Sequence, residues 1–134
     1  MKLKHKPDIH ALFRHVQKSD DFVTWLRDEG DILVSAADVL GGQIWARKAK
    51  EIVVTARTGG NVAARRKTLI ALRQLLHRDD ACLLNKDDAW RLMSLHPDDP
   101  KATRAMLCAD AIGRGIRAFE ALRLAGVTSI SRGV

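Results

Sequence analysis

Apolar residues recur at helical spacing along most of this chain, and this periodicity constrains the fold more than any other feature. The first set at i, i+3, i+4 and i+7, the stripe of an amphipathic helix, is Ile9, Leu12, Phe13 and Val16. Signals for strands are weak, because no Asn-Gly or Asp-Gly pair joins two alternating runs and the chain has no tyrosine. We therefore predict an all-α fold.

Capping residues, glycine and proline divide the first part of this pattern into short pieces. Pro7 suits the first turn of a helix. Ser19 is a suitable N-cap for a short second helix, which Gly30 would end. Residues 31–34 fit a turn of helix or a short strand equally well. We expect three separate pieces before Gly41 and Gly42.

Four further helices are predicted after that glycine pair. The clearest start signal is Asp99-Pro100, an N-cap followed by proline at the first helical position. The predicted helices lie between Gly42 and Gly59, between Asn61 and Asp79, between Asn85 and Pro97, and between Asp99 and Gly126. We therefore predict one compact domain over residues 1–134, a bundle of five to seven helices. Short connections that contain glycine or proline join the helices, and the ends at 1–6 and 127–134 are expected to be flexible.

Length and composition favour a folded protein of the cell interior. The chain has 134 residues, 46% of them hydrophobic and 29% charged, which is enough to bury a core without metal or disulfide support. We expect Cys82 and Cys108, which have apolar neighbours, to be buried and reduced. The chain shows neither a transmembrane stretch nor the pattern of a signal peptide. We therefore expect a cytoplasmic protein without a membrane partner.

Positive charge is concentrated in the middle of the chain. Residues 44–78 contain nine Lys and Arg against the single acidic residue Glu51, so this segment carries +8, whereas the whole chain carries +7. Such an excess favours a polyanionic partner. We predict that helical geometry gathers these cations on an outward face that contacts nucleic-acid phosphates. The predicted contact residues are Arg47, Lys48, Lys50, Arg57, Arg65, Arg66, Lys67 and Arg73.

Two features near this segment have two interpretations each. Gly59, Gly60 and Asn61 precede a cluster of cations, so their backbone N–H groups either bind phosphate or form a C-cap and an N-cap. Gly113 and Gly115 interrupt the last predicted helix at a cost of about 1 kcal/mol each. They indicate either the close approach of a neighbouring helix or second subunit, or a local break.

The last predicted helix carries its own cations, interspersed with Asp110 and Glu120. This alternation of sign is typical of an ordinary salt-bridged surface. The cations are Arg104, Arg114, Arg117 and Arg123.

The chain matches motifs for specific binding or catalytic functions only weakly. Segment 37–41 has the spacing of a helix-turn-helix turn, but Arg47 and Lys50 fall where that motif needs apolar residues. Trp45 is the one aromatic residue beside the cations, and we favour core packing over base stacking for it. The acidic doublets are better explained as helix caps than as metal ligands. We predict no catalytic residues, no metal, no cofactor and no enzyme activity.

The sequence therefore predicts a nucleic-acid-binding accessory protein that contacts the phosphate backbone of DNA or RNA. In charge and length the chain is similar to small basic helical subunits of nucleoprotein complexes. The alternative is an interaction module, an inhibitor or adaptor, which docks the same basic face on an acidic protein. A homo-oligomer is compatible with either interpretation.

Overall fold

The longest element of the protein is a continuous helix, α1 (Ile9–Gly41), of 33 residues. At 1.5 Å per residue it is about 50 Å long. The computed structural model describes residues 9–77 and 95–126. Within these residues α1 is followed by α2 (Gln43–Arg57), a short 3-10 helix η1 (Val62–Arg65), α3 (Arg66–Leu76) and α5 (Pro100–Leu124).

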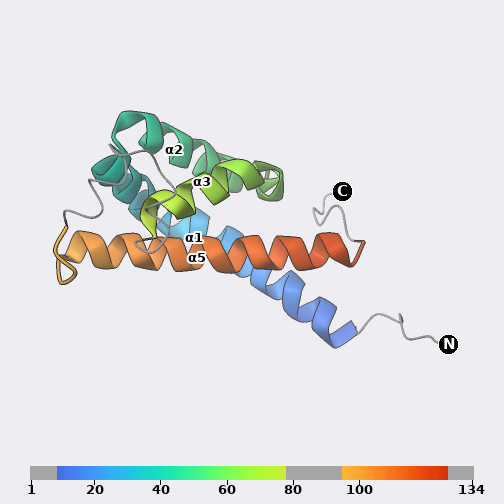
Figure 1. Cartoon of the computed structure of the whole chain (residues 1–134). Helices are drawn as coiled ribbons and strands as arrows, with labels where there is room; N and C mark the ends of the chain where they lie inside the picture. Colours follow the sequence, from blue (N-terminus) through green and yellow to red (C-terminus); the bar gives the residue numbers. More distant parts are fainter. Residues whose placement is uncertain (1–8, 78–94, 127–134) are drawn as a thin grey trace.

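The helices are arranged around α1, which packs chiefly against α2 and α5. Figure 1 shows α1 crossing α5 at an angle, with α2 and α3 side by side above α5. The first turns of α1 extend beyond the other helices at the lower right of this view. The apolar side chains there have little cover, since Ile9 is 62% and Phe13 is 68% exposed.

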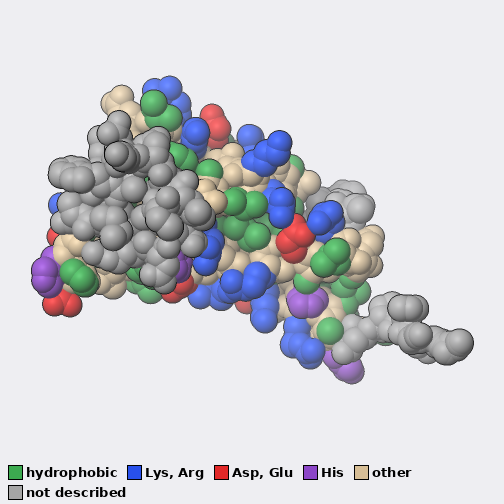
Figure 2. All heavy atoms as spheres, in the orientation of Figure 1, with side chains coloured by type: hydrophobic (Ala, Val, Ile, Leu, Met, Phe, Trp, Pro, Cys, Tyr) green, Lys and Arg blue, Asp and Glu red, His purple; other side chains and the backbone are tan. Residues whose placement is uncertain are grey.

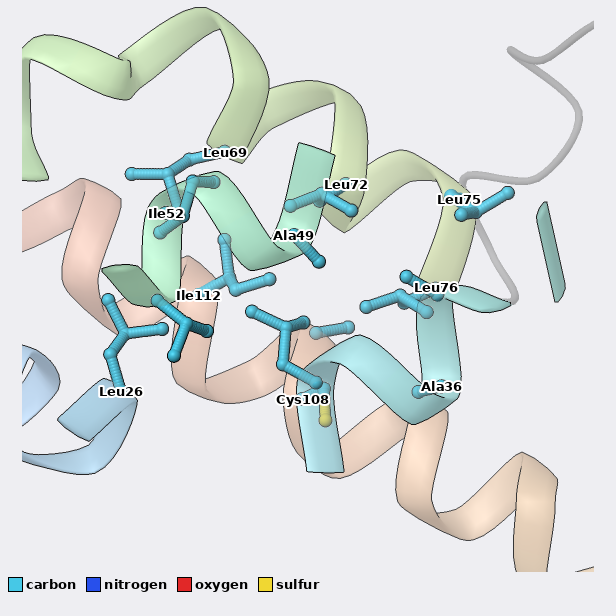
Figure 3. Packing of buried hydrophobic residues seen from close by; sticks show 14 of the residues in the cluster. Leu26, Ala36, Ala49, Ile52, Leu69, Leu72, Leu75, Leu76, Cys108 and Ile112 are labelled. Carbon is cyan, nitrogen blue, oxygen red and sulfur yellow. The ribbon is translucent and has the colours of Figure 1, made fainter. Parts of the chain in front are cut away.

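The core lies where α1, α2, α3 and α5 meet. Four leucines of α3 are fully buried, and α3 packs chiefly against α5 and α1 (Figure 3). They are Leu69, Leu72, Leu75 and Leu76. Opposite them lie Ile52 of α2 and Ile112 and Cys108 of α5. Burial of the Cys108 thiol, which is free, raises its pKa to about 11.

The prediction of three pieces before Gly41 is wrong, because α1 continues through Ser19 and Gly30. Both residues are buried inside the helix. A Cβ atom at Gly30 would lie 2.6 Å from Cγ1 of Val53, so the absence of a side chain lets α2 approach α1. The close packing of the two helices compensates for the roughly 1 kcal/mol by which glycine disfavours a helix.

The all-α prediction is confirmed for the described residues, which form four α-helices and η1 and contain no strand. Seven helices at most were predicted, and α1 replaces three of them by one; a further predicted helix lies in the part of the chain that is not described, which leaves four. The helix predicted after Asn85, together with the ends at 1–6 and 127–134 and Cys82, lies outside the described residues. None of the helices described is apolar over a stretch long enough to cross a membrane.

The boundaries at α2 and α5 agree with the predicted ones. α1 ends at Gly41 and α2 begins after Gly42, which has a positive φ of 80°. The Asp99 side chain accepts a hydrogen bond of 2.8 Å from the backbone N–H of Lys101, with Pro100 at the first helical position. This is the predicted N-cap.

Candidate nucleic-acid interface

Helix α2 has one buried face and one charged face. Ala49, Ile52, Val53 and Ala56 form the buried face. At about 100° per residue, Arg47 lies opposite this buried face and Lys50 lies at its edge, about 60° from Arg47 around the helix, and both side chains are exposed. The sequence prediction that these two cations share an outward face is consistent with this geometry.

A groove of about 350 Å³ between α2 and η1 collects three of the predicted contact residues. We call it the basic groove. It is lined by Arg47, Lys50, Glu51, Val54, Thr55 and Arg65. Arg65 comes from η1, so the groove joins cations from two elements. Val54 is 47% exposed and adds an apolar patch to the same surface.

The three cations of the basic groove are available to an external anion. Among the residues that the structure describes, no acidic side chain forms an ion pair with Arg47, Lys50 or Arg65. Glu51 is the one carboxylate in the lining of the groove. The positive potential of this surface is therefore only partly neutralised, which favours the approach of a polyanion.

Lys48 and Lys67 do not line the groove, although they lie one and two positions after Arg47 and Arg65 in the chain. The Lys48 ammonium is 4.6 Å from the centre of the Trp45 ring, a distance suited to a cation–π contact. Trp45 itself is partly buried and packs against the core, as predicted. Lys67 is exposed in the first turn of α3.

Three other predicted contact residues are engaged elsewhere. Arg57 donates from Nε to the backbone oxygen of Arg27 at 3.2 Å and pairs with Asp31 at 3.4 Å, which ties α2 to α1. Arg66 Nε is 2.6 Å from Glu120 Oε2 of α5. The Arg73 side chain lies against α5, with Nε 3.0 Å from the position that a Cβ atom on Gly113 would take. Because these three side chains contact neighbouring helices, the eight predicted contact residues do not form one continuous basic face.

The two glycines after α2 form a C-cap. The N–H of Gly60 donates to the Thr55 oxygen at 2.8 Å, and the N–H of Gly59 donates to the Ala56 oxygen at 3.4 Å. Gly59 has a positive φ of 76°, which completes a Schellman motif. The N–H groups of both glycines therefore already have acceptors within α2, which favours the C-cap interpretation of these two residues. Asn61 precedes η1, and its side chain caps nothing.

Figure 2 shows Lys and Arg side chains over α2, η1 and α3 along the upper part of the molecule, and a second series over α5 below. On α5 the exposed cations Arg104, Arg114 and Arg117 form no ion pair with described residues. Arg123 pairs with Glu120 at 2.8 Å. The predicted salt-bridged surface of this helix therefore occurs at its C-terminal end.

The sequence interpretation gave no role to Arg27. Its Nε donates to the Ala56 oxygen at 2.9 Å, across 29 positions of the chain. No periodic pattern or motif signals such a contact. In the described part of the chain, no group of three or more His, Cys, Asp or Glu side chains is placed to hold a metal ion.

No family model, no curated protein and no solved structure matches this chain. What its surfaces can bind follows from their own residues and geometry.

Proposed function

We propose that the protein binds the phosphate backbone of nucleic acid through the basic groove, as an accessory protein without strong sequence preference. The observation that carries this proposal is the convergence of Arg47, Lys50 and Arg65, which are exposed and have no acidic partner among the described residues. Lys48 and Lys67 supply further charge beside them.

The chemistry of the groove suits phosphates better than bases. Lys and Arg side chains are the usual donors to phosphate oxygens, and such contacts position a nucleic acid without reading its sequence. Trp45, the aromatic residue closest to these cations in sequence, is partly buried against the core and has the Lys48 ammonium over its ring, so it is poorly placed for base stacking. The proposal covers double-stranded DNA and RNA and single strands of either.

The first test compares two triple variants in their affinity for a fluorescently labelled generic duplex and single strand at about 50 mM salt. The variant of the basic groove carries Arg47→Gln, Lys50→Gln and Arg65→Gln. The matched control carries Arg104→Gln, Arg114→Gln and Arg117→Gln on α5, so both variants lose three exposed cations. Fluorescence anisotropy measures binding, and circular dichroism checks the fold.

We expect the groove variant to lose about tenfold or more in affinity, because three phosphate contacts disappear. The α5 control should lose less than about threefold, since it changes only the long-range field. Absence of binding by the unmodified protein, or equal losses in the two variants, would contradict the proposal.

A second candidate function is docking on an acidic protein. The observation that favours it is the exposed apolar surface on α2, where Ile44 is 66% and Val54 is 47% exposed. A partner with carboxylates around an apolar side chain would match such a surface. A stoichiometric protein partner that stays bound after nuclease treatment, and that the groove variant fails to capture, would support this candidate over nucleic acid.

A further inference from the structure

A second and larger cleft lies on another side of α2 and η1 from the basic groove. Its volume is about 690 Å³, within the range typical of small-molecule sites. It is formed where the middle of α1, the segment from Gly59 to η1, and the C-terminal end of α5 meet. We call it the arginine cleft, because Arg27 of α1, Arg66 at the start of α3 and Arg123 of α5 line it.

Apolar side chains form part of the wall of this cleft. Val23 and Phe119 are half-buried, and Val62 and Leu122 are buried. Such a surface offers van der Waals contact to a ring or a short hydrocarbon body. The cleft therefore combines an apolar wall with guanidinium groups.

The three guanidinium groups are held in place by interactions within the protein. Glu120 accepts from Arg123 Nη2 at 2.8 Å through Oε1, and its Oε2 is 2.6 Å from Arg66 Nε. The Nε of Arg27 donates to the Ala56 oxygen. The carboxylate of Glu120 and the backbone oxygen of Ala56 thus restrict the rotamers that the arginines would otherwise sample.

Most guanidinium N–H groups of the cleft remain available. A guanidinium has five N–H donors, and each of these three arginines uses one nitrogen for a contact with the described residues. The remaining N–H groups have the fork geometry that matches carboxylate and phosphate oxygens. The three arginines also outnumber the two acidic residues of the cleft, Asp20 and Glu120.

We propose that the arginine cleft binds a small organic anion, a phosphate monoester or carboxylate joined to an apolar or ring-bearing body. The anionic group pairs with the unused N–H groups of Arg66 and Arg123, and the body lies against Phe119 and Val23. This site goes beyond the proposed binding of nucleic acid, because it uses another cleft and a ligand of another size.

Isothermal titration calorimetry with two probes tests the proposal. AMP represents a phosphate monoester on a ring-bearing body, 1-naphthoate represents a carboxylate, and adenosine is the uncharged control. We expect at least one anion to bind with a dissociation constant below about 1 mM. Adenosine should bind at least about tenfold more weakly, because it lacks the charge-assisted hydrogen bonds.

Two variants with opposite expected effects on the affinity for the anion, and one control variant, test whether the anion binds in this cleft. Arg123→Gln should weaken binding of the anion about tenfold, because it removes charged donors. Glu120→Gln keeps the shape of the side chain and one oxygen that can accept from Arg66 or Arg123, but it removes a negative charge from the cleft, so it should strengthen binding severalfold. Arg117→Gln, on the same helix outside the lining of the cleft, should leave the affinity within about twofold.

Three results of these titrations would overturn the proposal. These are no binding of either anion at about 10 mM, adenosine bound as tightly as AMP, and equal effects of Arg123→Gln and Arg117→Gln.

The triple variant of the basic groove separates this proposal from the previous one. It should retain the affinity for AMP while losing affinity for the duplex, and loss of both would assign the anion to the basic groove.

Discussion

Gly113 and Gly115 of α5 face two different helices, and their missing side chains matter to different degrees. A Cβ atom at Gly115 would overlap ring carbons of Phe22 in α1. Phe22 is buried, stacks on Trp25 and makes an edge-to-face contact with Phe119, so its ring has little room to move. At Gly113 the nearest atom is Arg73 Nε at 3.0 Å, near the end of a flexible side chain.

We predict that Gly115→Ala lowers the free energy of unfolding by about 1–3 kcal/mol, because overpacking against Phe22 exceeds the gain in helix propensity. Gly113→Ala is the matched control and should change stability by less than about 1 kcal/mol, since Arg73 can shift while the helix gains propensity. Urea denaturation of both variants measures the difference. Equal losses would contradict the assignment of Phe22 as the rigid neighbour.

The sequence signals these two glycines but not their neighbours. Their cost inside a helix predicts that something approaches closely, and the structure confirms this over a local break, because α5 is continuous. The approaching groups are side chains of Phe22 and Arg73 rather than another backbone. Phe22 lies far from Gly115 in the chain, and no local pattern indicates which distant residue fills such a gap.

At the scale of the elements, Glu120 links the start of α3 to the end of α5. Its carboxylate pairs with Arg66 of α3 and with Arg123 of its own helix. The hydrogen bond from Arg123, together with the positive charges of Arg123 and Arg66, holds the pKa of Glu120 below its ordinary value of 4.5. Ionised Glu120 therefore stabilises the folded state above that ordinary pKa.

We predict that Glu120→Gln destabilises the protein near pH 7 and that this difference from the unmodified protein shrinks as the pH falls below 4.5. The contribution is lost as the pH falls through the lowered pKa, where Glu120 becomes protonated in the folded protein too. Urea denaturation at several pH values measures both proteins. In Arg123→Gln, NMR titration should show the pKa of Glu120 rising toward its ordinary value. A difference that stays constant with pH would be inconsistent with this link.

Local sequence signals correctly predicted that the described chain is helical, but they predicted only some of the helix boundaries. Asp99-Pro100 and the glycine pairs around α2 are correct boundaries, because caps act through neighbouring backbone groups. Ser19 and Gly30 carry the same local signals inside α1. There the burial of Leu26 and Leu33 against other helices decides the outcome, and a local signal does not report it.

At the scale of the whole molecule, the positive segment is divided between two surfaces and several interhelical contacts. Helical periodicity alone places Arg47 and Lys50 on one face of α2. Arg65 joins Arg47 and Lys50 in the basic groove because η1 places it there. Arg66 does not, because it pairs with Glu120, which is 54 positions away in the chain. Charge density was therefore visible in the sequence, whereas its distribution over the surface required the tertiary structure.

The central claim is that the basic groove contacts phosphates, and the salt dependence of duplex binding tests it most directly. With Arg47, Lys50 and Arg65 in the groove and Lys48 and Lys67 beside it, we predict a slope of log affinity against log salt between about −3 and −4.5. The groove variant should flatten this slope by about 3, one unit for each cation removed. An unchanged slope in that variant would contradict the claim.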